Sequence, residues 1–334
     1  MPRKTARSSC PTAVRAPGMV TAVGTARRSC GKAGKARIFT PIQDSSGESR
    51  LTASIHPLFL LALRRISSAI HDGRLISGLA RHLRDLRDSL RELRLRLSLG
   101  QRYSQGKQSF PAIHQIGDFS SSHQTRLLKS SFEGVQSEGH SPLPHEIRQI
   151  EGMSGQKYRS LINRLVGSMS DARYLEIGSW AGSTAAAALH GNRVRALCID
   201  NWSEFGGPRE LFFANIKKVL TPNIQFEVIE RDFRAVDYKD IGTFNIYLFD
   251  GPHAEKDQYD GIMIVQPALA NPFILIVDDW NWREVRLGTF RALLDARCRV
   301  EASIEIRTNE NPKLAGRASH WHNGYFIGVV NKTP

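Results

Sequence analysis

The stretch YLEIGSWAGSTAAAALHGNRVRALCID, residues 174–200, limits more than any other which fold this chain can adopt. It holds a short apolar run, a turn with two glycines, an alanine-rich segment and a second apolar run that ends in an acid. Apolar runs of this length are typical of buried strands, and alanine is the residue that best favours a helix. We therefore expect a strand over 174–177, a helix over 183–189 and a strand over 194–199.

The glycine-bearing turn indicates what this unit binds. Gly178 and Gly182 allow the backbone to approach a ligand closely, and Asp200 lies where an acid can accept the two hydroxyls of a ribose. A dinucleotide-binding turn needs a glycine where Trp180 stands, and the indole would block a pyrophosphate. The pattern favours a nucleoside without phosphates, S-adenosylmethionine, over NAD or FAD. The alternative is that both glycines only serve a tight turn of another α/β domain.

Apolar runs and amphipathic segments continue to alternate after this unit, which predicts a parallel sheet with right-handed crossovers. The last two apolar runs, 302–306 and 325–330, have no helix-length segment between them and fit an antiparallel pair. We expect an α/β, Rossmann-like, doubly wound sheet of seven mostly parallel strands with an antiparallel last strand. The other expected strands are 225–230, 244–249 and 273–277, and the other expected helices are 145–168, 208–220, 257–270 and 284–296.

Nearly every expected strand ends in an acid. Asp200, Asp232 and Asp250 follow three of the strands, and Asp278 and Asp279 follow a fourth. Ligands of open α/β sheets bind beyond the carboxyl ends of the strands, although a single Asp there can also be an ordinary cap or turn residue. The last three acids come from adjacent strands, and gathered oxygen ligands suit Mg²⁺ or a similar divalent cation. Without a cation these carboxylates would repel one another and their pKa values would rise.

Five segments resemble class I S-adenosylmethionine-dependent methyltransferases, in particular an uncharacterised family related to the catechol, sugar and macrolide O-methyltransferases. The resemblance covers residues 144–334 and none of residues 1–140. The segments that carry it are EGMSGQKYR at 151–159, YLEIGSWAGST at 174–184, IDNW at 199–202, YLFDGPH at 247–253 and VDDWNW at 277–282.

The resemblance implies which residues form each part of a site. Asp250, Asp278 and Asp279 would bind the cation. From their position we also expect Trp280, Trp282, His320, Trp321 and His322 to line the acceptor side, with the alternative that the tryptophans near strand ends are core residues. The cofactor would be bound by Met153, Ser154, Glu176, Gly178, Ser179, Trp180, Gly182, Ser183, Thr184, Asp200, Asn201, Trp202 and Asp232.

The expected base differs from those of the related enzymes. The catechol enzymes carry a lysine three residues after the acid that corresponds to Asp250, and this chain has His253 there. The sugar enzymes carry an acid two residues after it, and this chain has Pro252 there. Because histidine titrates near neutral pH, we expect His253 to take the proton from the acceptor. The alternatives are that His253 binds or supports the metal, or that it is a loop histidine without a role in the reaction.

The implied activity is cation-assisted methylation of a hydroxyl group on a small molecule. A metal-independent methyltransferase that acts on nitrogen or on a carboxyl group is the first alternative. The second is a non-catalytic nucleoside-binding domain whose basic arm binds nucleic acid or directs assembly. Nucleic acid is disfavoured as a partner, because the basic residues of the segment 1–43 are not interleaved with aromatic ones.

The net positive charge of the chain is confined to its N-terminal part, residues 1–143. Residues 1–143 hold 23 Lys or Arg and 9 acids, whereas residues 144–334 hold 23 of each. We expect a disordered basic tail over 1–50, a helical segment over 51–99, a linker over 100–143 and the catalytic domain over 144–334. Leucines and one isoleucine repeat at heptad spacing over 76–97, which predicts either a coiled coil that joins chains into a homo-oligomer or one packed amphipathic helix.

The cysteines and the hydropathy bear on location. The four cysteines are widely spaced and form no CxxC pair, which argues against a disulfide framework and against a zinc knuckle. No apolar run reaches the roughly 20 residues that a membrane helix needs. We therefore expect a cytoplasmic protein that does not bind membranes.

Overall fold

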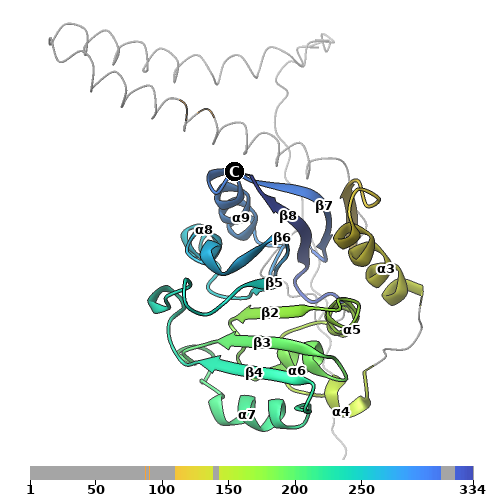
Figure 1. Ribbon diagram of the computed structural model, residues 1–334, viewed down its shortest axis with the longest axis vertical. Coiled ribbons are helices and arrows are strands. Elements are labelled where there is room, and N and C mark those ends of the chain that lie inside the picture. The colour runs from red at the N-terminus through yellow and green to blue at the C-terminus, as the bar shows by residue number, and fades with distance from the viewer. Residues whose placement is uncertain (1–86, 88–89, 91–109, 138–142, 310–319, 334) are drawn as a thin grey trace, which may run out of the picture. The chain divides into compact units, whose positions relative to one another are not determined.

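The computed structural model describes residues 87, 90, 110–137, 143–309 and 320–333 (Figure 1). The expected tail over 1–50 lies outside the described residues, and so does nearly all of the segment 51–99. Of the heptad region only Arg87 and Leu90 are described, both helical, and the side chain of Leu90 is half exposed. The coiled coil and the homo-oligomer that it would form stay predictions.

One mostly parallel sheet forms the centre of the described domain. Its eight strands lie in the order β1-β7-β8-β6-β5-β2-β3-β4, in which β6, β5, β2, β3 and β4 run parallel, while β8 is antiparallel to both β6 and β7. The expected doubly wound fold with an antiparallel last strand is confirmed, and one strand is added to the seven expected. The strands are β1 (Ala112–Gly117), β2 (Ala172–Ile177), β3 (Val194–Ile199), β4 (Ile224–Ile229), β5 (Phe244–Phe249), β6 (Leu269–Val277), β7 (Cys298–Arg307) and β8 (Tyr325–Lys332).

Helices cover both faces of this sheet (Figure 1). Along β2, Tyr174 faces the core under α3 to α7, and the next residue, Leu175, faces the core under α8 and α9. Both faces of the central strands are therefore apolar, which explains why these strands read as continuous apolar runs. The helices are α3 (His123–Ser137), α4 (His145–Arg148), α5 (Gln156–Gly167), α6 (Ser183–Leu189), α7 (Arg209–Lys217), α8 (Glu255–Met263) and α9 (Arg283–Asp295).

The expected linker over 100–143 is wrong for residues 110–137. Strand β1 pairs antiparallel with β7, and helix α3 buries Leu128, Phe132 and Val135 in the core. The helix was hidden because two of its buried positions, Thr125 and Ser131, carry hydroxyl groups that interrupt the apolar period. The folded domain therefore begins before the expected boundary at residue 144.

Some of the other elements also differ from expectation. The helix expected over 145–168 is two helices, α4 and α5, separated by the loop 149–155. Helix α8 ends at Met263, earlier than expected, and β6 begins at Leu269, so the expected 257–270 helix runs into the strand. None of the helices in the described part of the chain is both long enough and apolar enough to span a membrane.

The packing of α3 can be tested by truncating Phe132, whose ring lies 5.9 Å from that of Trp321 in the core. Phe132→Ala should lower the free energy of unfolding by about 3–5 kcal/mol, because it removes a buried aromatic ring. Lys129→Ala, an exposed position on the same helix, is the control and should change it by less than about 0.5 kcal/mol. Equal stability of the two variants in urea denaturation would contradict the packing of α3 and support the linker interpretation of this segment.

Candidate functional site

The carboxyl ends of the parallel strands form one aligned row. The amides of Gly178, Asp250 and Asp278, each the first residue after its strand, donate to the last carbonyl of a neighbouring strand at 3.0, 2.9 and 3.2 Å. The chain leaves β2 toward α6 on one face of the sheet and leaves β5 toward α8 on the other. Such a reversal opens a crevice between the two strands, where ligands of α/β sheets bind.

A cavity of about 360 Å³ opens at this crevice, a volume within the range of small-molecule sites. Some of the residues that line it were not expected from the sequence, among them Phe205, Phe233 and Asn323. The expected site residues that line it are Met153, Gly178, Trp180, Asp200, Asn201, Asp232, Asp250, His253, Asp278 and Asp279.

The turn after β2 uses its own amides within the protein. The Trp180 amide donates to Asp200 Oδ2 at 2.8 Å, and the Gly182 amide donates to the Ser179 carbonyl at 2.7 Å. The Gly178 amide is held by β3, as described above. A phosphate-binding turn would instead direct such amides at the anion. These three amides are therefore unavailable to a phosphate, which agrees with the inference drawn from Trp180 in the sequence.

Asp200 is fixed on both of its oxygens. Oδ2 accepts from the amide of Trp180, and Oδ1 accepts from the amide of Trp202 at 2.7 Å. An ionised carboxylate has about four lone-pair sites, so each oxygen can still accept a ligand hydroxyl. The two amides thereby set the orientation in which this carboxylate faces the cavity.

Seven of the expected cofactor residues do not line the cavity, namely Ser154, Glu176, Ser179, Gly182, Ser183, Thr184 and Trp202. Glu176 is an interior residue whose carboxylate accepts from the Tyr174 hydroxyl at 2.5 Å, and burial raises its pKa to about 8. Gly182 has φ +81°, and a side chain there would meet the ring of Phe212. Trp202 packs against the same ring at 5.3 Å. These residues support the turn by packing on the side away from the cavity.

A buried arginine holds the loop that carries Met153 to the cavity. The Arg159 guanidinium is 2% exposed and donates to the carbonyls of Arg148 and Ile150 and to Ser154 Oγ, at 3.0, 2.8 and 2.8 Å. Ser154 Oγ lies in turn 3.2 Å from Ser183 Oγ at the start of α6. The loop is thus tied to both α5 and α6.

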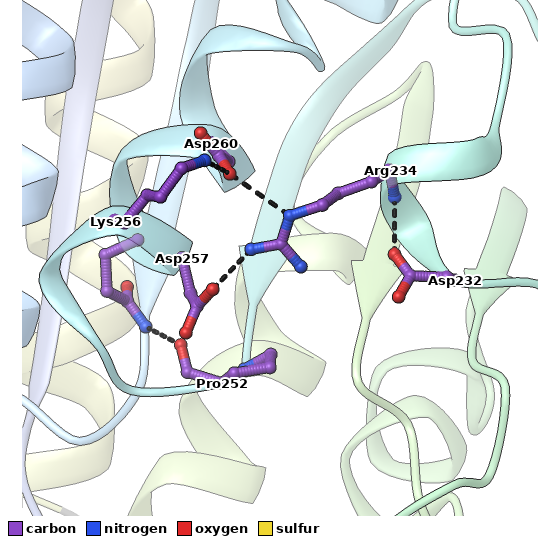
Figure 2. Close-up of polar contacts among 7 residues, drawn as sticks. Asp232, Arg234, Pro252, Lys256, Asp257 and Asp260 are labelled. Carbon is purple, nitrogen blue, oxygen red and sulfur yellow. Dashed lines mark hydrogen bonds and ion pairs between the residues drawn. The ribbon is translucent and has the colours of Figure 1, made fainter.

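Asp232 lies in the loop that follows β4 and also lines the cavity. Its carboxylate accepts from the amide of Arg234 at 2.8 Å and caps the short 3₁₀ turn that follows. The Arg234 guanidinium forms ion pairs with Asp257 and Asp260 of α8, as Figure 2 shows. These contacts fix the end of β4 to the helix that follows the loop around His253.

The expected cation ligands do come together. His253 Nε2 lies 2.6 Å from Asp279 Oδ2, Asn323 Nδ2 donates to Asp279 Oδ1 at 2.6 Å, and the Asp279 amide donates to Asp278 Oδ1 at 2.6 Å. Two groups have donor atoms within 4.8 Å of one another and share Asp279. They are Asp250, His253 and Asp279, and Asp278, Asp279 and His322. Carboxylate and imidazole donors at this spacing suit a divalent cation.

The protons of this cluster are redistributed by burial and by proximity. Burial raises the pKa of Asp250 to about 7, and the charge of Asp279 adds to this effect. Burial and Asp250 raise the pKa of Asp278 well above its ordinary value. Burial opposes the charges of Asp279 and His253, but their mutual hydrogen bond prevails, so the pKa of Asp279 is lowered and that of His253 is raised. The hydrogen bond to His253 thus favours the ionised form of Asp279, whereas burial favours the neutral forms of Asp250 and Asp278.

The turn that carries Asp278 and Asp279 is anchored in the core. The Asn281 side chain bonds both the amide and the hydroxyl of Thr308, at 2.9 Å each, and Arg286 donates to the carbonyls of Trp280 and Asn281. The Trp280 side chain is fully buried against Phe290 and Phe326. The expectation that Trp280 lines the acceptor side is therefore wrong.

The other expected acceptor-side residues divide in the same way. Trp321 is 2% exposed and belongs to the core beside Phe132 and Tyr325. His320 is exposed and does not line the cavity, whereas Trp282 and His322 do. The expectation was wrong for Trp321 and His320, because the spacing of aromatic residues does not distinguish a core position from a cavity wall.

Four non-glycine residues that line the cavity have left-handed backbone, namely Trp180, Phe205, Asp279 and His322, with φ of +44°, +49°, +56° and +42°. Such conformations are costly for side chains other than glycine and concentrate at functional sites. Their position around one cavity supports its identification as the functional site.

No protein-family model matches the sequence, and no curated protein matches it. Solved structures that resemble it include TomG, an O-methyltransferase of Streptomyces achromogenes in complex with S-adenosylmethionine, at 12% identity over 63% of this chain and 99% of that one, with a TM-score of 0.43. A putative RNA methyltransferase of Pyrococcus horikoshii is 13% identical over 63% of this chain and 100% of that one, with a TM-score of 0.40. TrmN of Thermus thermophilus is 14% identical over 56% of this chain and 52% of that one, with a TM-score of 0.39. This chain spans about half the length of TrmN.

The raised pKa of Asp250 predicts how stability depends on pH. A carboxyl whose folded pKa is about 7, above its ordinary 3.8, stabilises the fold at low pH and loses that contribution as the pH rises through 7. Without metal, Asp250→Asn should therefore be more stable than the parent at pH 8, by about 1 kcal/mol or more, and nearly equal to it at pH 4. Asp240→Asn, at an exposed position, is the control. Thermal unfolding in EDTA measures the difference, and a difference that does not change with pH would contradict this assignment.

Proposed function

We propose that this protein is a methyltransferase that transfers the methyl group of S-adenosylmethionine to a hydroxyl group of a small molecule. One observation carries the proposal. The cavity is lined both by the turn after β2 with a fixed acid, Asp200, and by a cluster of acids and imidazoles. The first part suits a nucleoside without phosphates, and the second suits the activation of an acceptor.

The nucleoside half of the site orients the donor. Asp200 would accept the ribose hydroxyls, and Asp232, which follows the neighbouring strand and also lines the cavity, would accept from the base. Met153 and Phe205, with exposed fractions of 44% and 63%, would cover the ligand at the mouth of the cavity. The bound cofactor supplies a methyl group on a positively charged sulfur. Because displacement there needs near-linear alignment, these contacts contribute mainly by positioning.

The acceptor half of the site removes a proton. His253 donates through Nε2 to Asp279, which leaves Nδ1 as the nitrogen that can accept the proton of a hydroxyl. Its ring lies 5.3 Å from that of Trp282 at an interplanar angle of 28°, and this stacking holds the imidazole against the cavity wall. Asp279 thus orients His253 and stabilises the imidazolium.

A divalent cation fits the same cluster. Asp250, Asp278 and Asp279 would hold it, and the fit rests on the convergence of their oxygens with two imidazoles. When bound, such an ion lowers the pKa of a hydroxyl group that coordinates it. We propose that it assists the reaction, as Mg²⁺ or another divalent cation.

A second candidate is methylation without a metal. Two features favour it, because the His253–Asp279 contact and the raised pKa values of Asp250 and Asp278, which favour their neutral forms, reduce the repulsion in the cluster without a cation. His253 would then be the only base. The acceptor in this reading is a nitrogen or a carboxylate that needs less activation than an alcohol.

Turnover separates the two candidates. The protein, incubated with methyl-labelled cofactor and a panel of phenols, sugars, amines and carboxylic acids, should label a hydroxyl compound, and EDTA should abolish the labelling. Asp250→Asn should reduce turnover at least about tenfold, with partial recovery in excess Mg²⁺, because mass action refills a weakened site. Full labelling of a compound by the parent in EDTA would remove the metal from the mechanism, and labelling of amines or carboxylic acids alone would favour the second candidate.

A further inference from the structure

His322 belongs to the cluster although no strand-end pattern indicates it. It lies 43 residues after Asp279, just before β8, and its donor nitrogen lies within 4.8 Å of donor oxygens of Asp278 and Asp279. His322 therefore adds a nitrogen donor to the group in which Asp278 and Asp279 supply oxygens.

The backbone of His322 is held in place from two directions. Its carbonyl accepts from the Thr308 hydroxyl at 2.5 Å, and the carbonyl of the next residue, Asn323, accepts from the Asn281 amide at 2.9 Å. Asn281 belongs to the turn that carries Asp278 and Asp279, and its side chain also bonds Thr308. The imidazole and the two carboxylates are thus mounted on one hydrogen-bonded unit, and His322 has a left-handed φ of +42°.

We propose that His322 is a nitrogen ligand of the cation, and that the site selects a transition-metal ion such as Mn²⁺, Co²⁺ or Zn²⁺ over Mg²⁺. This inference rests on the cation of the proposed function and deepens it by naming the class of ion. Mg²⁺ prefers oxygen donors in a near-ideal octahedron and dehydrates reluctantly. Imidazole is a softer donor that favours the first-row transition ions, whose affinities rise from Mn²⁺ to Co²⁺.

The spacing of the donors agrees with this ligand set. Nitrogen and oxygen ligands lie about 2.0–2.2 Å from such an ion, so two of them on opposite sides are about 4 Å apart. The group of Asp278, Asp279 and His322 has its donor atoms within 4.8 Å, which small side-chain movements would bring to that distance. Asp278 and Asp279 are 5% and 7% exposed, so the ion would be largely shielded from water.

His253 is the competing nitrogen donor. It belongs to the other group with Asp250 and Asp279, but its Nε2 is engaged with Asp279 at 2.6 Å and its ring stacks on Trp282. We therefore assign the ligand role to His322 and leave His253 as the base. A role of His253 as ligand in place of His322 is one of the outcomes of the test.

The test measures metal binding directly, on the full chain and without cofactor, so its result does not depend on methyl transfer. Calorimetric titration of the parent should give at least about tenfold tighter binding of Mn²⁺ and Co²⁺ than of Mg²⁺. His322→Asn should weaken Mn²⁺ and Co²⁺ at least about tenfold and Mg²⁺ much less, and it should change the visible spectrum of bound Co²⁺. Asparagine is chosen because it tolerates left-handed backbone.

Three further variants complete the design. His320→Asn, an exposed histidine two residues away that does not line the cavity, is the matched control and should bind all three ions like the parent. His322→Asp should bind Mg²⁺ more tightly than His322→Asn does, since it replaces the imidazole by a hard oxygen donor, and thermal unfolding verifies that each variant is folded. The proposal is overturned if the parent prefers Mg²⁺, or if His322→Asn binds Co²⁺ like the parent while His253→Gln loses it. Absence of methyl transfer with the predicted metal preferences intact would count against the proposed function alone.

Discussion

The site depends on a hydrogen-bonded row that continues the sheet one residue beyond its strands. Ile177 pairs with both Ile199 and Phe249, and Phe249 pairs with Val277, so the four strands end at one level. The amides that follow them remain bonded to the neighbouring strand, which brings every first residue after a strand to the same edge. Acids that lie 28 to 78 residues apart along the chain, Asp200, Asp250 and Asp278, thereby face one cavity.

This convergence has a cost that the surrounding structure offsets. Carboxyls at one edge repel each other and lose hydration, which is why the pKa values of Asp250 and Asp278 are raised. Asp279 also has left-handed backbone, a conformation that costs about 1 kcal/mol or more. The hydrogen bonds from His253 and Asn323 and the anchoring of Asn281 hold this arrangement. The repulsion among these carboxyls lowers the stability of the fold, and a bound ligand of opposite charge would raise it again.

The sequence predicted best where local pattern and burial coincide. The unit over 174–200 folds as expected, within two residues at each boundary, because its strands are buried on both faces and its turn requires left-handed glycines. Strand ends could be located for the same reason, so most acids of the site could be named. Glu176 was misplaced because alternation along β2 directs it into the interior, two residues before the row that faces the cavity.

Other features depend on contacts that a single sequence does not encode locally. Helix α3 escaped detection because Thr125 and Ser131 occupy buried positions, and β1 is short and pairs with a strand nearly 200 residues away. His322 and Asn323 reach the cluster only because β8 returns antiparallel beside β6. Trp280 and Trp321 were expected on the acceptor side, but both belong to the core, because a tryptophan near a strand end can serve either place.

Binding of the cofactor product tests the central claim most directly, because a nucleoside without phosphates is what the turn and Asp200 are inferred to accept. Calorimetry should show that the parent binds S-adenosylhomocysteine and does not bind NADH. Asp200→Asn removes the charge at nearly constant shape and should weaken that binding at least about tenfold, since a hydrogen bond to a charged group contributes about 1.5–3 kcal/mol. Binding of NADH with no response to S-adenosylhomocysteine would contradict the account.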